Sequence, residues 1–208
     1  MPHWSRVAIA LPMLLSAAAA LAQEVQPLAP NEPLAGVSQR EWSQRWWQWA
    51  FSFERARSPV ADRTGERCAS RQEGPVWFLA GAYGSQRVER YCRVPQGKQL
   101  FFPLINTIYY SAEGPTDSCQ RLQAQAMAMA ANPAALVLSI DGNRIAGLKA
   151  HRQDTSGCFS LVPGGQPDAA GSGYYMALPP LSKGRHRIEF GGVLPAFAQA
   201  ISYTLDVE

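Results

Sequence analysis

Two acidic residues, Glu113 and Asp117, stand four positions apart between a Phe-rich run and an Ala-rich run. Two carboxyl groups can divide general-acid and general-base roles when their surroundings separate their pKa values, and Asn106 lies just upstream. The same residues suit a structural role, because an aspartate near a helix N-terminus interacts favourably with the helix dipole. A small secreted hydrolase that uses this carboxylate pair is therefore one hypothesis.

Histidine is the second residue type that could act as a general base here. His151 and His186 are the two histidines outside the N-terminal segment, and neither has a partner at a characteristic spacing. The chain also lacks the G-x-S-x-G, S-x-x-K, H-E-x-x-H and P-loop signatures. We keep His186, on an expected strand, as a third candidate member of the hydrolase. The simpler interpretation is a surface or hydrogen-bonded histidine.

Aromatic residues offer a different kind of candidate site, because their rings can stack on the faces of sugars. Trp47, Tyr109 and Tyr110 are the ligand-binding candidates on this hypothesis. The tryptophans recur at helical spacing, however, which is typical of a buried helix face. Other aromatic residues whose exposure the sequence leaves open are Trp77, Tyr83, Tyr91, Tyr174 and Tyr175.

Arginine outnumbers lysine by 16 to 3, and ten arginines fall between Arg40 and Arg93 beside six acidic residues. Such a cluster can form a patch that binds phosphate or another anion. A genome rich in G and C produces the same bias through its codons, and the sequence alone favours that explanation. The formal net charge of +3 does not indicate a nucleic-acid partner.

The cysteines Cys68, Cys92, Cys119 and Cys158 predict two disulfides. Three pairings are possible. Sequential pairing, Cys68 with Cys92 and Cys119 with Cys158, closes the shorter loops, and each bond would then stabilise the fold by about 3–4 kcal/mol. A zinc site needs cysteines close together, whereas the nearest pair here is 24 positions apart. We expect no metal and no cofactor.

The N-terminus is typical of a cleavable export signal. Arg6 precedes an apolar run, and Ala20-Leu21-Ala22 fits the small-x-small rule for cleavage before Gln23. Removal of residues 1–22 leaves 18 basic and 16 acidic residues, a net charge of +2. We therefore expect a periplasmic or extracellular protein with no membrane attachment after cleavage. An extended leader over 23–36 and a single domain over 37–208 should follow.

Two helices are expected in that domain. The first spans 37–57, where Ser38 and Glu41 form a capping box and Ser58-Pro59 ends the helix. The second is alanine-rich and spans 116–131. The apolar stripe of the first consists of Trp42, Trp46, Trp49 and Phe53, widened by Trp47 and Phe51.

After the first helix the period of the apolar residues changes from 3.6 to 2, as in strands. In 87–94, for example, Val88, Cys92 and Val94 share one face, and Pro103 indicates an edge strand or a bulge. We predict a mainly β, single domain, a β-sandwich or jelly-roll-like fold flanked by the two helices. The expected strands are 75–80, 87–94, 100–105, 135–140, 144–148, 157–162, 174–178, 185–190 and 201–207.

Several motifs follow one another in this order along the chain. They are Asp62-Arg-Thr-Gly65 with Cys68-Ala69, G-P-V-W-F-L-A-G from Gly74, C-R-V-P-Q-G-K from Cys92, L-F-F-P from Leu100 with Asn106, and the ending from Leu178 to Gly192. Together with the Trp-rich helix they resemble a family of uncharacterised bacterial secreted proteins, although Lys183 replaces an expected proline. The resemblance implies one exported domain and a Cys68–Cys92 pair, and it implies no activity.

These observations predict an exported bacterial protein. The favoured function is a non-catalytic binding or structural module of the cell envelope, with a glycan or a protein as its partner. The alternative is the small hydrolase built around Glu113, Asp117 and His186. The sequence leaves the oligomeric state open.

Overall fold

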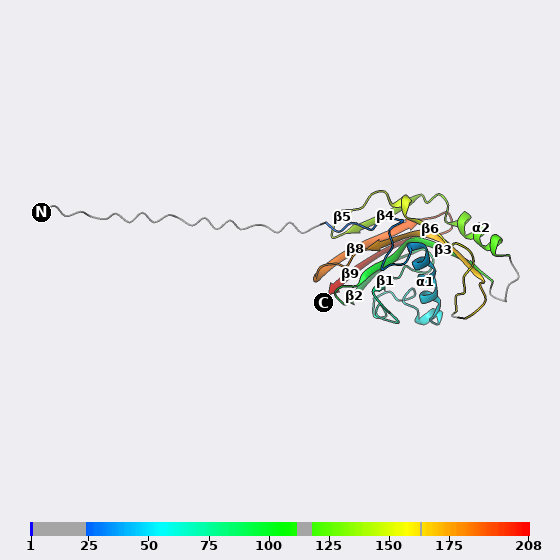
Figure 1. Cartoon of the computed structure of the whole chain (residues 1–208), viewed down its shortest axis with the longest axis horizontal. Helices are drawn as coiled ribbons and strands as arrows, with labels where there is room; N and C mark the ends of the chain where they lie inside the picture. Colours follow the sequence, from blue (N-terminus) through cyan, green and yellow to red (C-terminus); the bar gives the residue numbers. More distant parts are fainter. Residues whose placement is uncertain (2–23, 112–117, 163) are drawn as a thin grey trace.

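The computed structural model describes Met1 and residues 24–111, 118–162 and 164–208 (Figure 1). The strands of these residues form two sheets. The four-stranded sheet has the order β1-β3-β7-β6, with β1 (Val76–Phe78), β3 (Gln99–Tyr110), β7 (Ala169–Leu178) and β6 (Arg152–Asp154). The five-stranded sheet has the order β2-β9-β8-β4-β5, with β2 (Gln86–Val94), β9 (Ala198–Val207), β8 (Gly184–Val193), β4 (Ala135–Ile140) and β5 (Asn143–Arg144).

The main core lies between the two sheets. Leu100, Phe102 and Leu104 of β3 belong to the same buried cluster as Ile201, Tyr203 and Leu205 of β9. Alternation along β2 also agrees with the sequence, since its even-numbered residues from Val88 to Val94 are buried and its odd-numbered residues are exposed. The mainly β, two-sheet prediction is confirmed. Parallel pairing of β1 with β3 and of β2 with β9 means that this strand order does not establish a jelly roll.

Helix α1 (Gln39–Phe51) covers the other face of the four-stranded sheet. Ser38 caps the helix as predicted, because its hydroxyl accepts a hydrogen bond from the Glu41 backbone N–H, while the Glu41 carboxylate pairs with Arg45. The indole N–H groups of Trp42 and Trp46 donate to backbone carbonyls, 2.7 Å and 3.1 Å away, of Leu34 and Leu79. The tryptophan stripe is therefore a core element, with its members Trp42, Trp46, Trp47 and Trp49 all buried.

Three helix and strand predictions need correction. Helix α1 ends at Phe51 and not at Arg57, because Ser52 caps it with its backbone N–H and its hydroxyl, and the short 3-10 helix η1 (Arg55–Arg57) follows. The strand expected over 157–162 is reduced to one bridge between Phe159 and Ala169. The strand expected over 144–148 is reduced to β5 and the 3-10 helix η2 (Leu148–His151).

Two other features sharpen the predictions. Pro103 lies in an interior strand, and the register with β7 shifts between Pro103 and Ile105, so the proline marks a bulge and not an edge. Helix α2 (Cys119–Met129) begins after the cap residue Ser118 and packs on β3 and β7, where Thr107 donates to the Ala126 carbonyl. No helix of the described residues is long and apolar enough to cross a membrane.

The disulfides are Cys68–Cys92 and Cys119–Cys158, the sequential pairing. Cys92 lies on β2, so the first bond fixes the loop that ends at Cys68 against the edge of the five-stranded sheet. In the same loop the Thr64 carbonyl accepts a hydrogen bond from the Tyr91 backbone N–H. This loop also forms one wall of the site described below.

Reduction of the disulfides should destabilise the protein. Each bond restricts the unfolded chain and is worth about 3–4 kcal/mol in the chain-entropy model. Dithiothreitol should therefore lower the melting temperature measured by circular dichroism. An unchanged melting temperature in fully reduced protein, with free thiols verified by mass spectrometry after alkylation, would contradict this account.

Candidate functional site

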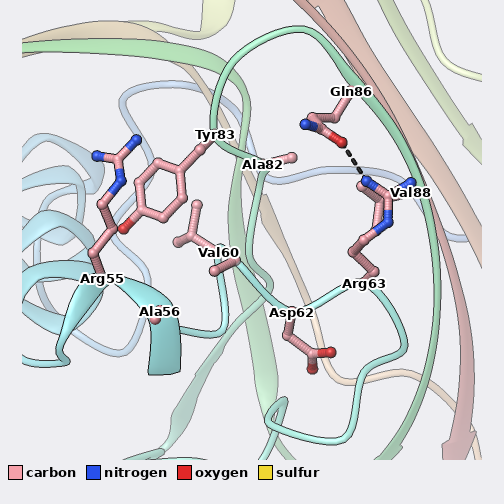
Figure 2. Close-up of a pocket in the computed structure, with 10 residues that line it drawn as sticks. Arg55, Ala56, Val60, Asp62, Arg63, Ala82, Tyr83, Gln86 and Val88 are labelled. Atoms are coloured by element: carbon pink, nitrogen blue, oxygen red, sulfur yellow. Dashed lines mark hydrogen bonds between the residues drawn. The ribbon is translucent and has the colours of Figure 1, made fainter.

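A cleft of about 460 Å³ lies between the segment 55–63 and the segment 82–88 that leads into β2 (Figure 2). The first segment comprises η1 and the loop after it, and the second is a turn at the rim of the five-stranded sheet. A volume of this size falls in the range of small-ligand sites, roughly 300–1,000 Å³. The lining residues are Arg55, Ala56, Val60, Ala61, Asp62, Arg63, Ala82, Tyr83, Gln86 and Val88.

One wall of the cleft consists of Arg55 and Tyr83. The guanidinium carbon of Arg55 lies 4.3 Å from the centre of the Tyr83 ring, a cation–π distance. Arg55 is exposed, and its guanidinium makes no hydrogen bond or ion pair with another described side chain. Its N–H donors therefore face solvent while the ring fixes its position.

The opposite wall carries a second arginine. Arg63 donates a hydrogen bond to the side-chain oxygen of Gln86, at the start of β2, and a longer one to the Arg87 carbonyl at 3.5 Å. Figure 2 shows Arg63 and Gln86 on one side of the cleft and Arg55 with Tyr83 on the other. The two guanidinium groups thus flank a common space.

The floor between the arginines is apolar. Val60 and Val88 are buried and Ala82 is half-buried, and Figure 2 shows Val60 and Ala82 between the two walls. Burial of a ligand's apolar surface on this floor would contribute roughly 25 cal/mol per Å². The cleft therefore suits a ligand that combines an anionic group with an apolar face.

Asp62 is the acidic residue of the lining, and its carboxylate is engaged elsewhere. It accepts hydrogen bonds from the backbone N–H groups of Thr64 and Arg67, at 2.9 Å and 2.8 Å, and from the Thr64 hydroxyl. Burial acts to raise the pKa of the Asp62 carboxyl, but these hydrogen bonds outweigh it and the pKa lies below its ordinary value. Figure 2 shows the carboxylate directed away from Arg63, so it leaves both arginines available to an anion.

A third arginine, Arg90 of β2, lies beneath the cleft and is 4% exposed. Its guanidinium donates to the carbonyls of Asp62 at 2.8 Å, Ala80 at 2.6 Å and Gly81 at 2.9 Å. It also donates to the Tyr203 hydroxyl at 3.0 Å. Both chain segments that carry the cleft walls are therefore tied to one side chain.

Of the three predicted catalytic residues, His186 is the one that the structure describes. Glu113 and Asp117 lie outside the described residues. His186 is buried on β8, where its Nδ1 lies 2.7 Å from an Asp141 carboxylate oxygen and its Nε2 lies 3.2 Å from the Ser182 hydroxyl. This Ser-His-Asp arrangement superficially resembles a hydrolase triad.

The surroundings of His186 argue against that chemistry. Its Nε2 also lies 2.9 Å from the carbonyl oxygen of Ser182, which can only accept a hydrogen bond. A proton on Nε2 satisfies that carbonyl, whereas a general base needs the lone pair at the same position. Neither Ser182 nor His186 lines any of the five hollows described on the surface of the chain. Asp141 and His186 instead connect the turn after β4 to β8.

The predicted aromatic candidates also lie elsewhere. Trp47 is buried on α1, where its ring packs edge-to-face on Phe51. Tyr109 is half-buried, and the exposed Tyr110 packs edge-to-face on Phe51 at the end of β3. His151 is also buried, and burial lowers the pKa of its imidazole. None of these residues lines the cleft.

Among the described residues, no group of three or more His, Cys, Asp or Glu side chains could hold a metal ion. The sequence did not single out either arginine of the cleft, Arg55 or Arg63. Arg63 lies within the Asp62-Arg-Thr-Gly65 motif, and the sequence presented Tyr83 only as one of several aromatic residues of unknown exposure.

Comparison with known proteins identifies no relative. No family model and no curated protein matches the chain. Among solved structures, PbICP-C in complex with falcipain-2 aligns over 65% of this chain and 100% of that chain, at 13% identity and a TM-score of 0.28. Amebosin aligns over 60% of this chain and 98% of that chain, at 8% identity and a TM-score of 0.22. Likenesses this low carry no functional argument.

The Asp62 carboxylate should make folding stability depend on acid pH. Its native pKa lies below the unfolded value of about 3.9, so its contribution is present above that value and is lost as the pH falls through the native pKa. Urea unfolding from pH 7 to pH 3 should show a smaller acid loss for Asp62→Asn than for the wild type. The matched control is Glu66→Gln, on the same loop but exposed, and an equal acid loss in both variants would refute the assignment.

Ser182 should not react as an activated nucleophile. A fluorophosphonate probe labels serines whose hydroxyl is deprotonated by a neighbouring base. We expect no adduct on the purified protein by intact mass spectrometry. An adduct that disappears in Ser182→Ala and in His186→Gln would reverse our interpretation of this cluster.

Proposed function

We propose that this protein is a non-catalytic exported module of the cell envelope that binds an acidic sugar unit in the cleft between Arg55 and Arg63. The observation that carries the proposal is the pair of available guanidinium groups across an apolar floor, with the neighbouring Asp62 carboxylate engaged by its own loop. Arginine donors bind carboxylates through charge-assisted hydrogen bonds.

A uronic acid fits these features better than a neutral sugar does. Its carboxylate can accept hydrogen bonds from Arg55 or Arg63, its hydroxyl oxygens can accept from the arginine on the other wall, and the apolar face of its ring can lie on Val60 and Ala82. Tyr83 adds an aromatic surface to the same wall. Because the floor offers no nucleophile and the one carboxylate of the described lining, that of Asp62, is engaged by its own loop, binding without turnover is the function that this cleft supports best.

Export is the second part of the proposal. Two disulfides are consistent with a protein that folds outside the cytoplasm, where thiols oxidise. A periplasmic or extracellular location brings the cleft to the glycans of the envelope.

Isothermal titration calorimetry with trigalacturonate tests the proposal. The double variant Arg55→Ser/Arg63→Ser should lose about tenfold or more in affinity, because each charge-assisted hydrogen bond is worth about 1.5–3 kcal/mol. Arg57→Ser is the matched control, since Arg57 lies on the same 3-10 helix, pairs with Glu54 and does not line the cleft.

The neutral trisaccharide galactotriose provides the ligand control. Wild-type protein should bind it much more weakly than trigalacturonate, and added salt should weaken only the acidic ligand. Equal binding of the two trisaccharides, retention of affinity in the double variant, or no trigalacturonate binding at millimolar protein would each reject the proposal.

A further inference from the structure

The outer face of the five-stranded sheet contains a second hollow, of about 570 Å³. The residues in one row across four of its strands are Arg87 of β2, Ala200 of β9, Gly191 of β8 and Val137 of β4. Small residues occupy the two middle strands, and longer side chains occupy the strands on either side. This difference in side-chain size makes the hollow.

The lack of a side chain at Gly191 is a constraint of the sheet. A Cβ atom there would lie 2.2 Å from the Gln199 carbonyl oxygen, which is too close for any other residue. The neighbouring Ala200 and Ser202 are also short. The hollow therefore exists because these positions carry no side chain or a short one. Two exposed valines, Val137 and Val193, also line it.

Positive charge at this hollow is only partly neutralised. Arg187 pairs with Glu189 at 2.9 Å on the same strand. Arg87 and Arg144 also line the hollow, and neither forms an ion pair with another described residue. Glu89, next but one to Arg87 on β2, is the remaining acidic residue of the lining.

This hollow adjoins the cleft. Val88 lines both, and Arg63 of the cleft donates a hydrogen bond to the carbonyl of Arg87. Arg55, Arg63, Arg87 and Arg144 thus follow one another from the loops, over β2, to the far strand β5. Four strand spacings separate β2 from β5, a distance of about 19 Å. We call this series of four arginines the arginine track.

We infer that the ligand is a linear polyuronate, a polysaccharide with a carboxylate on each sugar unit. One unit lies in the cleft, and the rest of the chain continues along the arginine track. The inference rests on the proposed function, because the cleft supplies the first contact. Repeated carboxylates along one chain match cations spaced along one surface. A single acidic sugar would leave Arg87 and Arg144 unused.

An extended acidic polypeptide fits this surface less well. Such peptides most readily add to a free sheet edge through main-chain hydrogen bonds. The edge of β2 that the track crosses is already covered, since Thr64 accepts from the Tyr91 backbone and Gly65 packs against the same residue. A polysaccharide needs no free edge.

Comparison of short and long oligogalacturonates by calorimetry tests this inference. Wild-type protein should bind a long oligomer about tenfold or more tighter than trigalacturonate. Arg87→Ser/Arg144→Ser should remove most of this gain and should weaken the binding of trigalacturonate, which reaches less of the track, far less. Arg93→Ser is the matched control, because Arg93 is exposed on the same face of β2 but does not line the hollow.

A variant with an expected gain in affinity serves as a further control, because a misfolded variant could lose affinity but would not gain it. Glu89→Gln removes the carboxylate beside Arg87 and should tighten binding of the long oligomer by about twofold or more, with a smaller gain for trigalacturonate. If long and short oligomers bind equally through Arg55 and Arg63, the extension is wrong and the proposed function stands. If neither binds, both are wrong. Tighter binding of polyglutamate of matched length would overturn the polysaccharide in favour of an acidic polypeptide.

Discussion

The buried guanidinium of Arg90 is the contact on which the cleft and its surroundings depend. Removing a cation from water is costly, and a buried charge is tolerated only when hydrogen bonds replace its hydration. Arg90 donates such hydrogen bonds to backbone carbonyls of the segments 60–62 and 80–81 and to the Tyr203 hydroxyl, with no ion pair to a described carboxylate. Only arginine presents enough donors in a fixed fork to reach all of them, so lysine could not replace it. Tyr203 is affected in turn, since burial raises the pKa of its phenol while Arg90 opposes that shift.

Local patterns predicted the elements around this contact well. The Ser38 cap, the buried tryptophans of α1 and the alternation of β2 each depend on short-range spacing, which the sequence displays directly. The same alternation places residue 90 on the inward face of β2 between Val88 and Cys92. A charged residue at an inward position contradicts the pattern, and only the tertiary structure reveals the carbonyls that make its burial tolerable.

The candidate site was not predictable in the same way. Its walls come from two loops whose side chains meet only after β2 is paired and the Cys68–Cys92 bond is formed. In the sequence, Arg55 and Arg63 are two members of an arginine-rich half and have an adequate explanation in codon usage. Their neighbours in the fold distinguish them. Tyr83 stacks on Arg55, Gln86 accepts a hydrogen bond from Arg63, and the Asp62 carboxylate is bound by its own loop. The His186 cluster shows the converse, since donor and acceptor roles at Nε2 decide its chemistry and cannot be deduced from spacing.

The parallel pairing of β2 with β9 has a consequence for biosynthesis. β9 lies between β2 and β8, yet it follows both in the chain, and Gln86 pairs with Gln199. A nascent chain emerges N-terminus first, so β2 has no strand with which to pair within its sheet until β9 has been synthesised. Chains that are cut or stalled before β9 cannot join the two parts of the five-stranded sheet. Such chains keep apolar strands exposed to chaperones and proteases, so the order of the strands limits the folded population to chains that include β9.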